Sequence, residues 1–155
     1  WRPFIKYLIR VVLPKLEIKL PNVKFQIIGD GTGSVSHLHE RVEGAYSVAI
    51  LIVGYGLVAF RDPNGIRPLV YGKKSDDQYM VASESVALDC LGYTIVDDVQ
   101  PGQTVIFHKK EIFKSDYNKG KLYPCIFEYV YLARPDSVMN GISVYQARLK
   151  MGDYL

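Results

Sequence analysis

Apolar residues recur at two different spacings along the chain, and the spacing changes after Gly44. Before Gly44 a long stretch repeats at steps of three and four residues, which is typical of an amphipathic helix. After it, short runs of β-branched and aromatic residues alternate with turn residues, which is typical of antiparallel strands. The pattern therefore predicts an α+β chain whose second part is mainly sheet.

The first part is predicted to begin with an amphipathic helix over residues 3–20, followed by a strand over 23–28. Lysine and arginine fill the positions between the apolar residues of the helix. Pro14 should end or kink this helix, because proline removes one helical N–H and its ring clashes with the preceding turn.

A glycine-rich loop over residues 29–34 and a second helix over 36–43 are expected next. Gly29, Gly31 and Gly33 would let backbone N–H groups approach an anion, so they are candidate nucleotide-loop residues. A tight strand-to-helix turn explains the same glycines equally well, and the sixth-position glycine of the dinucleotide fingerprint is missing.

The second part contains six short runs that read as an antiparallel meander. They lie at residues 46–53, 57–60, 69–71, 79–82, 94–96 and 104–108. An apolar and aromatic stretch follows at 124–132, then a break at 133–137. The apolar spacing after residue 138 indicates one more helix.

A single helix over residues 83–91 is expected to interrupt these strands. Ser83 or Ser85 can cap its first turn, and the charge of Glu84 suits the positive end of the helix dipole. Gly92 stands where a left-handed residue commonly ends a helix.

The connection RDPNGIRP, residues 61–68, predicts a tight bend between two strands. An aspartate before proline favours an extended backbone, and Pro63 fixes one turn angle. Asn64 and Gly65 adopt positive φ at little cost.

Two interpretations of the charges in this bend stay open. Arg61, Asp62 and Arg67 either tie down the connection through salt bridges and hydrogen bonds to the backbone, or the arginines bind a substrate anion. The pattern favours the first interpretation.

Composition limits the classes of function. With 155 residues, 48% of them apolar, the chain can bury the core of one ordinary globular domain. Its net charge of +3 is spread along the sequence without a basic cluster, so neither nucleic acid nor a membrane is indicated as a partner. Cys90 and Cys125 are too few for a disulfide framework, which favours a cytoplasmic location.

Smaller features exclude two further classes. No apolar stretch reaches membrane-spanning length, and no signal peptide precedes Trp1, so a cut or processed N-terminus is expected. His37 and His39 lie two residues apart, where helical side chains point in different directions, so no metal site is predicted.

Five ordered blocks carry a resemblance to a known family: FRDPNGIRPL, YMVASESVALDCLG, DVQPGQTVIF, CIFEYVYLARPDS and GISVYQARLKMG. Together they resemble the amidophosphoribosyltransferase family from about residue 42 to the end of the chain. The first block also occurs in other class II glutamine amidotransferases, whereas the last two single out this family.

The resemblance implies a partial N-terminal-nucleophile hydrolase sandwich, with two mostly antiparallel sheets between helical layers (αββα). Residues 42–123 would belong to the class II glutamine amidotransferase domain. Residues 124–155 would begin the linker to a phosphoribosyltransferase domain. The implied substrates are glutamine and phosphoribosyl pyrophosphate, in the first committed step of purine biosynthesis.

The same resemblance requires a chain-terminal cysteine as nucleophile, whose α-amino group carries the proton. Trp1 occupies the start of this chain, so we expect no catalytic residue here and an inactive polypeptide when alone. The resemblance instead makes one group of residues supports of the glutaminase fold: Arg61, Asp62, Asn64, Gly65, Arg67, Ser83 and Glu84.

Cofactors are implied by the family and expected to be absent from this chain. The family uses magnesium with phosphoribosyl pyrophosphate, and some members carry an iron–sulfur cluster. Cys125 stands at one cluster ligand position, but a cluster needs about four thiolates, so an inert thiol is the stronger interpretation.

Residues 2–30 resemble instead a retaining glycosyltransferase family with two Rossmann-like domains, of the N-acetylglucosaminyl-phosphatidylinositol transferase type. Residues 1–41 are therefore predicted to be a foreign or chimeric segment. Two alternative functions follow: a nucleotide-sugar-binding fragment, and a non-catalytic interaction module that pairs or self-associates through uncovered sheet faces.

Overall fold

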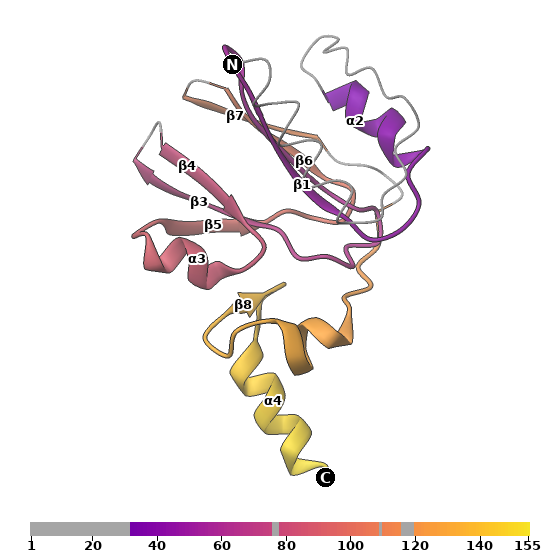
Figure 1. Cartoon of the computed structure of the whole chain (residues 1–155), viewed down its shortest axis with the longest axis vertical. Coiled ribbons are helices and arrows are strands. Elements are labelled where there is room, and N and C mark those ends of the chain that lie inside the picture. Colours follow the sequence, from indigo (N-terminus) through magenta and orange to yellow (C-terminus); the bar gives the residue numbers. More distant parts are fainter. Residues whose placement is uncertain (1–31, 76–77, 109, 116–119) are drawn as a thin grey trace.

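The computed structural model describes residues 32–75, 78–108, 110–115 and 120–155 (Figure 1). The helix predicted over 3–20, the strand predicted over 23–28, Gly29 and Gly31 lie outside these residues. In chain order the elements are α2 (Thr32–His39), β1 (Ser47–Ile52), β2 (Gly56–Arg61), β3 (Val70–Ser75), β4 (Gln78–Ala82), α3 (Ser85–Cys90), β5 (Thr94–Asp98), β6 (Thr104–His108), β7 (Glu111–Ser115), the π-helical turn η1 (Glu128–Leu132), β8 (Val138–Met139), β9 (Ile142–Ser143) and α4 (Val144–Asp153).

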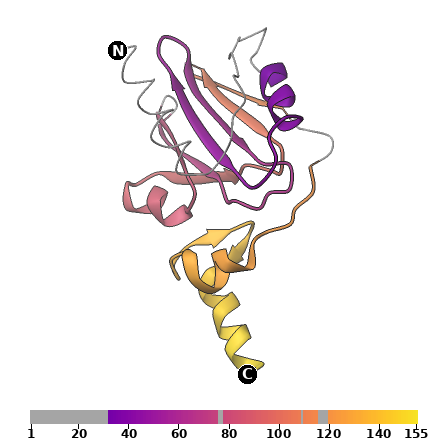
Figure 2. The same cartoon turned by 45° about the vertical axis from the view of Figure 1, so that its right-hand side comes forward.

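Two antiparallel sheets face each other. The first has the strand order β1-β2-β6-β7 and the second the order β4-β3-β5. Helix α2 covers the outer face of the first sheet, and α3 packs against the three strands of the second (Figures 1 and 2). The order helix, sheet, sheet, helix confirms the predicted α+β class and its αββα layering.

Two apolar clusters fill the spaces between these layers. The cluster under α2 contains Val35 and Leu38 of the helix together with Val58 and Phe60 of β2. The cluster between the sheets joins strand residues of both: Ala59, Leu69, Tyr71, Val99, Val105 and Phe107. Burial of these side chains supplies the main favourable free energy of folding in the described part of the chain.

Helix α2 begins and ends earlier than predicted. Its bounds place Val35 and Leu38 against the sheet, and the chain then turns back, because the N–H groups of Arg41 and Val42 both bond to the Leu38 carbonyl at 3.0 Å. Gly33, predicted in a loop, therefore lies in the first turn of the helix.

The start of α3 also differs from the prediction. Its N-cap residue is Glu84, which makes no side-chain capping bond, so the expected capping by Ser83 or Ser85 is wrong. The Ser85 hydroxyl accepts the N–H of Val138 at 2.8 Å instead. This serine is committed to a distant segment of the chain.

The other end of α3 is as predicted. Gly92 has a φ of 72°. Its N–H bonds to the Asp89 carbonyl, and the Tyr93 N–H bonds to the Leu88 carbonyl, both at 3.0 Å. These two bonds form a Schellman motif that ends the helix.

Residues 124–155 form a separate C-terminal unit below the sheets, made of η1, β8, β9 and α4 (Figures 1 and 2). Tyr129, Ala133, Met139 and Val144 form a small core of its own. Of the elements in this unit the sequence predicted only the final helix. Within the described residues, no helix is long and apolar enough to cross a membrane.

Candidate functional site: the buried arginine turn

Arg61, the last residue of β2, has the largest fully buried side chain among the described residues. It is 1% exposed and donates four hydrogen bonds. Its Nε bonds to the Arg67 carbonyl and its Nη2 to the Gly65 carbonyl, both at 2.7 Å. Its Nη1 bonds at 2.9 Å to the Val99 carbonyl and to Asn140 Oδ1. Four acceptors on one guanidinium compensate for its removal from water.

The carboxylate of Asp62 fixes the backbone of the same turn. This carboxylate is fully buried and accepts three backbone N–H groups: Asn64 at 3.0 Å, Ile66 at 3.1 Å and Arg67 at 3.2 Å. The backbone N–H of Asp62 bonds to the Tyr46 carbonyl at 2.8 Å. The bend that the sequence predicted is thus wound around one carboxylate.

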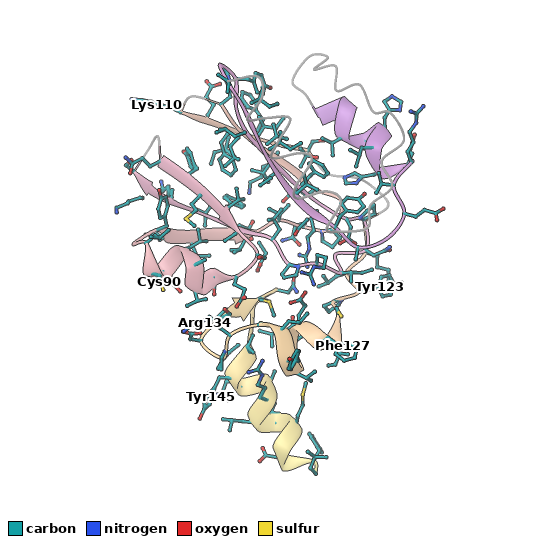
Figure 3. The ribbon with its side chains drawn as sticks, in the orientation of Figure 1. Cys90, Lys110, Tyr123, Phe127, Arg134 and Tyr145 are labelled. Atoms are coloured by element: carbon teal, nitrogen blue, oxygen red, sulfur yellow. The ribbon has the colours of Figure 1, made fainter. Side chains whose placement is uncertain are left out.

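Besides the bond from Arg61 to Asn140, contacts of Arg67 and Glu84 tie the sheets to the C-terminal unit. Arg67 Nη1 lies 2.5 Å from Glu128 Oε1 at the start of η1. Glu84 Oε2 accepts the Arg134 N–H and the Ser137 hydroxyl, both at 2.8 Å. Figure 3 shows Arg134 on the side of the unit that faces α3, the helix that ends at Cys90.

Burial and charge act against each other in this cluster. Burial lowers the pKa of Arg61, while the charges of Asp62 and Asp98 raise it. Burial raises the pKa of Asp98, against hydrogen bonds from the backbone of Asn140 and Gly141 and the charge of Arg61. Arg61 stays protonated because even a lowered arginine pKa leaves it charged at neutral pH.

Of the remaining predicted residues, Ser83 lies at the surface, and Cys125 lies beside the cluster, at a recess that Arg61, Glu128 and Asn140 also line. Ser83 is exposed in the bend between β4 and α3. Cys125 is half-buried, and the recess that it borders is too narrow for a water molecule. Among the described residues, no three His, Cys, Asp or Glu side chains are grouped to hold a metal, so a cluster ligand role for Cys125 stays a prediction. The nucleotide role proposed for the glycine loop also stays a prediction.

Sequence reasoning missed Asp98 and Asn140, and it considered His39 only as a metal ligand. Asn140 and Gly141 form an Asn-Gly pair between apolar residues, the strongest short-range signal of a hairpin, so this turn was open to prediction. His39 and Asp98 gave no comparable signal, because His39 contacts the carbonyl of Gly102, 63 residues away, and Asp98 lies near the distant Asn140–Gly141 turn.

Comparisons with known proteins agree with this architecture. Residues 26–90 match a family model described as a glutamine amidotransferase domain. Amidophosphoribosyltransferase of Pseudomonas aeruginosa is 52% identical over 127 residues, which cover 79% of this chain and 25% of that protein. The Escherichia coli protein of the same name is 48% identical over 128 residues, with the same two shares.

Solved structures give the same result. A structure described as the allosteric regulatory enzyme of purine biosynthesis has a TM-score of 0.74 at 31% identity, covering 84% of this chain and 28% of that chain. Glutamine phosphoribosylpyrophosphate amidotransferase from B. subtilis, in complex with ADP and GMP, has a TM-score of 0.68 at 29% identity, covering 95% and 34%.

The two sheets pack between helices, with the buried Arg61–Asp62 turn at the end of β2. This architecture defines a glutamine amidotransferase domain of the N-terminal-nucleophile hydrolase type. Within that class, the chain belongs to the amidophosphoribosyltransferase family. It spans about a quarter of the length of the curated relatives that it matches.

Proposed function

We propose that this chain contributes to the glutaminase step of an amidophosphoribosyltransferase, in which water hydrolyses glutamine to glutamate and ammonia. In the second step of such an enzyme, the ammonia displaces pyrophosphate from phosphoribosyl pyrophosphate and gives phosphoribosylamine. The observation that carries the proposal is the 52% identity over 127 residues to a protein of that name. The whole reaction would need groups beyond those described here, since the relatives are about four times as long as the matched segment.

Within this function, Arg61, Asp62 and Arg67 serve as supports of the fold and do not bind a substrate anion. The four hydrogen bonds of the Arg61 guanidinium described above all go to protein oxygens. Arg67 is paired with Glu128, and an anion would have to displace that carboxylate. Asn64 and Gly65 belong to the same turn, and Glu84 holds the adjoining segment 134–137.

The test compares two nitrogen donors. The protein is purified in the length that its source makes, and phosphoribosylamine formation is measured with glutamine and, separately, with ammonium chloride. We expect product with both donors. Product with ammonia alone would contradict a glutaminase role, and no product with either donor would overturn the proposal.

Two expectations about partners and cofactors accompany this function. We infer that magnesium enters with phosphoribosyl pyrophosphate and that this segment itself holds no cofactor. Metal analysis of the purified 155-residue chain checks this inference, and iron at one equivalent or more would contradict it. A cytoplasmic location is inferred from the free Cys90 and Cys125, and cell fractionation tests it.

Self-association is the remaining proposal about partners. Among the residues that the structure describes, most of the exposed large apolar side chains lie in the C-terminal unit, including Phe127 at 63% exposure and Tyr145 at 54% (Figure 3). Apolar surface of this kind favours association. Size-exclusion chromatography with light scattering measures the mass, and a monomer at high concentration would contradict the proposal.

A further inference from the structure

The turn between β8 and β9 has a backbone that few residues adopt. Val138 pairs with Ser143 and Met139 with Ile142, which leaves Asn140 and Gly141 as a two-residue turn. Their φ angles are 49° and 73°. Both lie in the left-handed region, where asparagine and glycine are the favoured residues.

Two charged groups contact this turn, the buried Arg61 and the half-buried Asp98. Arg61 Nη1 donates to Asn140 Oδ1 at 2.9 Å. The backbone N–H groups of Asn140 and Gly141 lower the pKa of the nearby Asp98 carboxylate, against the effect of burial. On its own side, Asn140 Nδ2 donates to the Tyr129 hydroxyl at 3.2 Å, which joins the turn to η1.

The two charged groups come from different sheets. Arg61 is the last residue of β2 in the first sheet, and Asp98 is the last residue of β5 in the second. Arg61 also bonds to the carbonyl of Val99, the residue after Asp98, at 2.9 Å. The tip of the C-terminal unit therefore contacts both sheets at the point where their strand ends meet.

Hydrogen bonds and one ion pair join the unit to the rest of the described chain. The apolar core of the unit is a cluster distinct from the two cores of the sandwich. Hydrogen bonds are directional and weaken steeply with geometry, whereas apolar contacts tolerate sliding. A shift of the C-terminal unit relative to the sheets would therefore change the contacts of both Arg61 and Asp98 with the Asn140–Gly141 turn.

We propose that the Asn140–Gly141 turn is a joint that couples the position of the C-terminal unit to the alignment of the two sheets, with Asn140 as its positioning residue. The proposal rests on the function proposed above, because the aligned sheets are the scaffold of the glutaminase step. Asn140 would act through Arg61 and Asp98 and would not touch glutamine.

The decisive variant is Asn140→Gly, which keeps the left-handed turn and removes both the acceptor for Arg61 and the donor for Tyr129. Asn140→Asp is its conservative partner, because it keeps an oxygen for Arg61. Gly54→Ala is the matched control: it strains a turn of the β1–β2 hairpin, with φ 81° and no atom within 4 Å of the added carbon. All are made in the protein in the length that its source produces.

The first measurement is hydrogen exchange of the backbone amides. For Asn140→Gly we expect exchange to rise about tenfold in both 61–68 and 97–103, since coupled contacts respond together. Asn140→Asp should stay nearer the wild type in 61–68, and Gly54→Ala should change neither segment. Faster exchange confined to 138–143, or no change anywhere, would overturn the joint.

The second measurement is the ratio of glutamine-dependent to ammonia-dependent phosphoribosylamine formation. Asn140→Gly should lower the glutamine-dependent rate about tenfold and leave the ammonia-dependent rate near that of the wild type. An equal fall of both rates would overturn the proposal. If the wild type forms no product, the proposed function fails, and the exchange result alone then decides on the joint.

Discussion

Arg67 and Glu128 lie 61 residues apart in the sequence and form an ion pair with 2.5 Å between Nη1 and Oε1. The two partners differ in exposure, since the Arg67 side chain is 40% exposed and that of Glu128 only 8%. Removing the arginine would leave a carboxylate shielded from water without its cation, which costs more than losing a surface pair.

Replacing Arg67 with methionine should therefore destabilise the chain by about 1–3 kcal/mol, because the Glu128 carboxylate loses a charge-assisted hydrogen bond. The double variant with Glu128→Gln should recover part of the loss. Urea denaturation of the two single variants, the double variant and the wild type measures the coupling. Additive losses would show that the pair contributes nothing of its own.

Asp62→Asn should destabilise the fold by about 2 kcal/mol or more, since an amide can present only one of the two oxygens that accept N–H groups from the turn. The Asn64 and Ile66 bonds go to Oδ1 and the Arg67 bond to Oδ2. Thermal unfolding measures the change.

Asp136→Asn is the control for this substitution. Asp136 pairs with Arg134 at 2.9 Å, but both side chains are at least half exposed. Exposed ion pairs contribute little, so no measurable change is expected. Equal losses in the two variants would contradict a special role for the buried carboxylate in the turn.

Features that depend on neighbouring residues in the sequence could be predicted, whereas features that depend on contacts between distant residues could not. Alternating apolar runs and turn residues predicted six strands, and the αββα layers implied by the family resemblance were confirmed. Strand β7 was missed, because its sequence EIFKS mixes charge with apolar residues at a sheet edge. Local patterns therefore located most elements, but the predicted meander is only partly right. β1 pairs with β2 and β3 with β4, whereas β2 and β3 lie in different sheets and β5 pairs with β3.

The candidate site was predictable only in its local half. The Arg61–Arg67 bend followed from turn chemistry, and the contacts of Asp62 within five residues agree with it. The bond from Arg61 to Asn140 spans 79 residues, and Glu84 meets Ser137 across 53. Such pairs form when separate segments pack together, so the spacing of apolar residues along the sequence does not predict them.

The pH dependence of stability should reflect His39, a buried residue of α2. Its Nε2 lies 3.1 Å from the Gly102 carbonyl and its Nδ1 2.7 Å from the Tyr46 hydroxyl. In the neutral ring, Nε2–H donates to the carbonyl and Nδ1 accepts from the tyrosine. Burial lowers the His39 pKa from the ordinary value of 6.5, against the bond to Gly102.

The folded state therefore takes up this proton at a lower pH than the unfolded state, and stability should fall as the pH drops below 6.5. Asp98, whose pKa is raised by burial, acts in the opposite sense at more acidic pH. Urea midpoints from about pH 8 to about pH 5.5 should fall less for His39→Gln than for the wild type. His37→Gln is the control, because that side chain is 84% exposed; a curve like that of His39→Gln would contradict the assignment.

Gly72 stands where β3 approaches β5 too closely for any side chain. A methyl group added there would lie 2.6 Å from the Thr94 carbonyl oxygen and 3.3 Å from Leu88 Cδ1. The register of the two strands also shifts between Tyr71 and Gly72, which marks an irregularity in the pairing. Only glycine, which has no Cβ atom, allows the two strands to approach this closely.

Gly72→Ala should thus destabilise the fold by about 2 kcal/mol, because a backbone carbonyl cannot give way as a flexible side chain does. Gly152→Ala, near the end of α4, is the matched control: the added carbon meets nothing within 4 Å, and alanine favours the helix over glycine. We expect that variant to be as stable as the wild type or slightly more so in urea denaturation. An unchanged urea midpoint for Gly72→Ala would contradict this prediction. It would show that β3 and β5 can move apart to accommodate a methyl group without loss of stability.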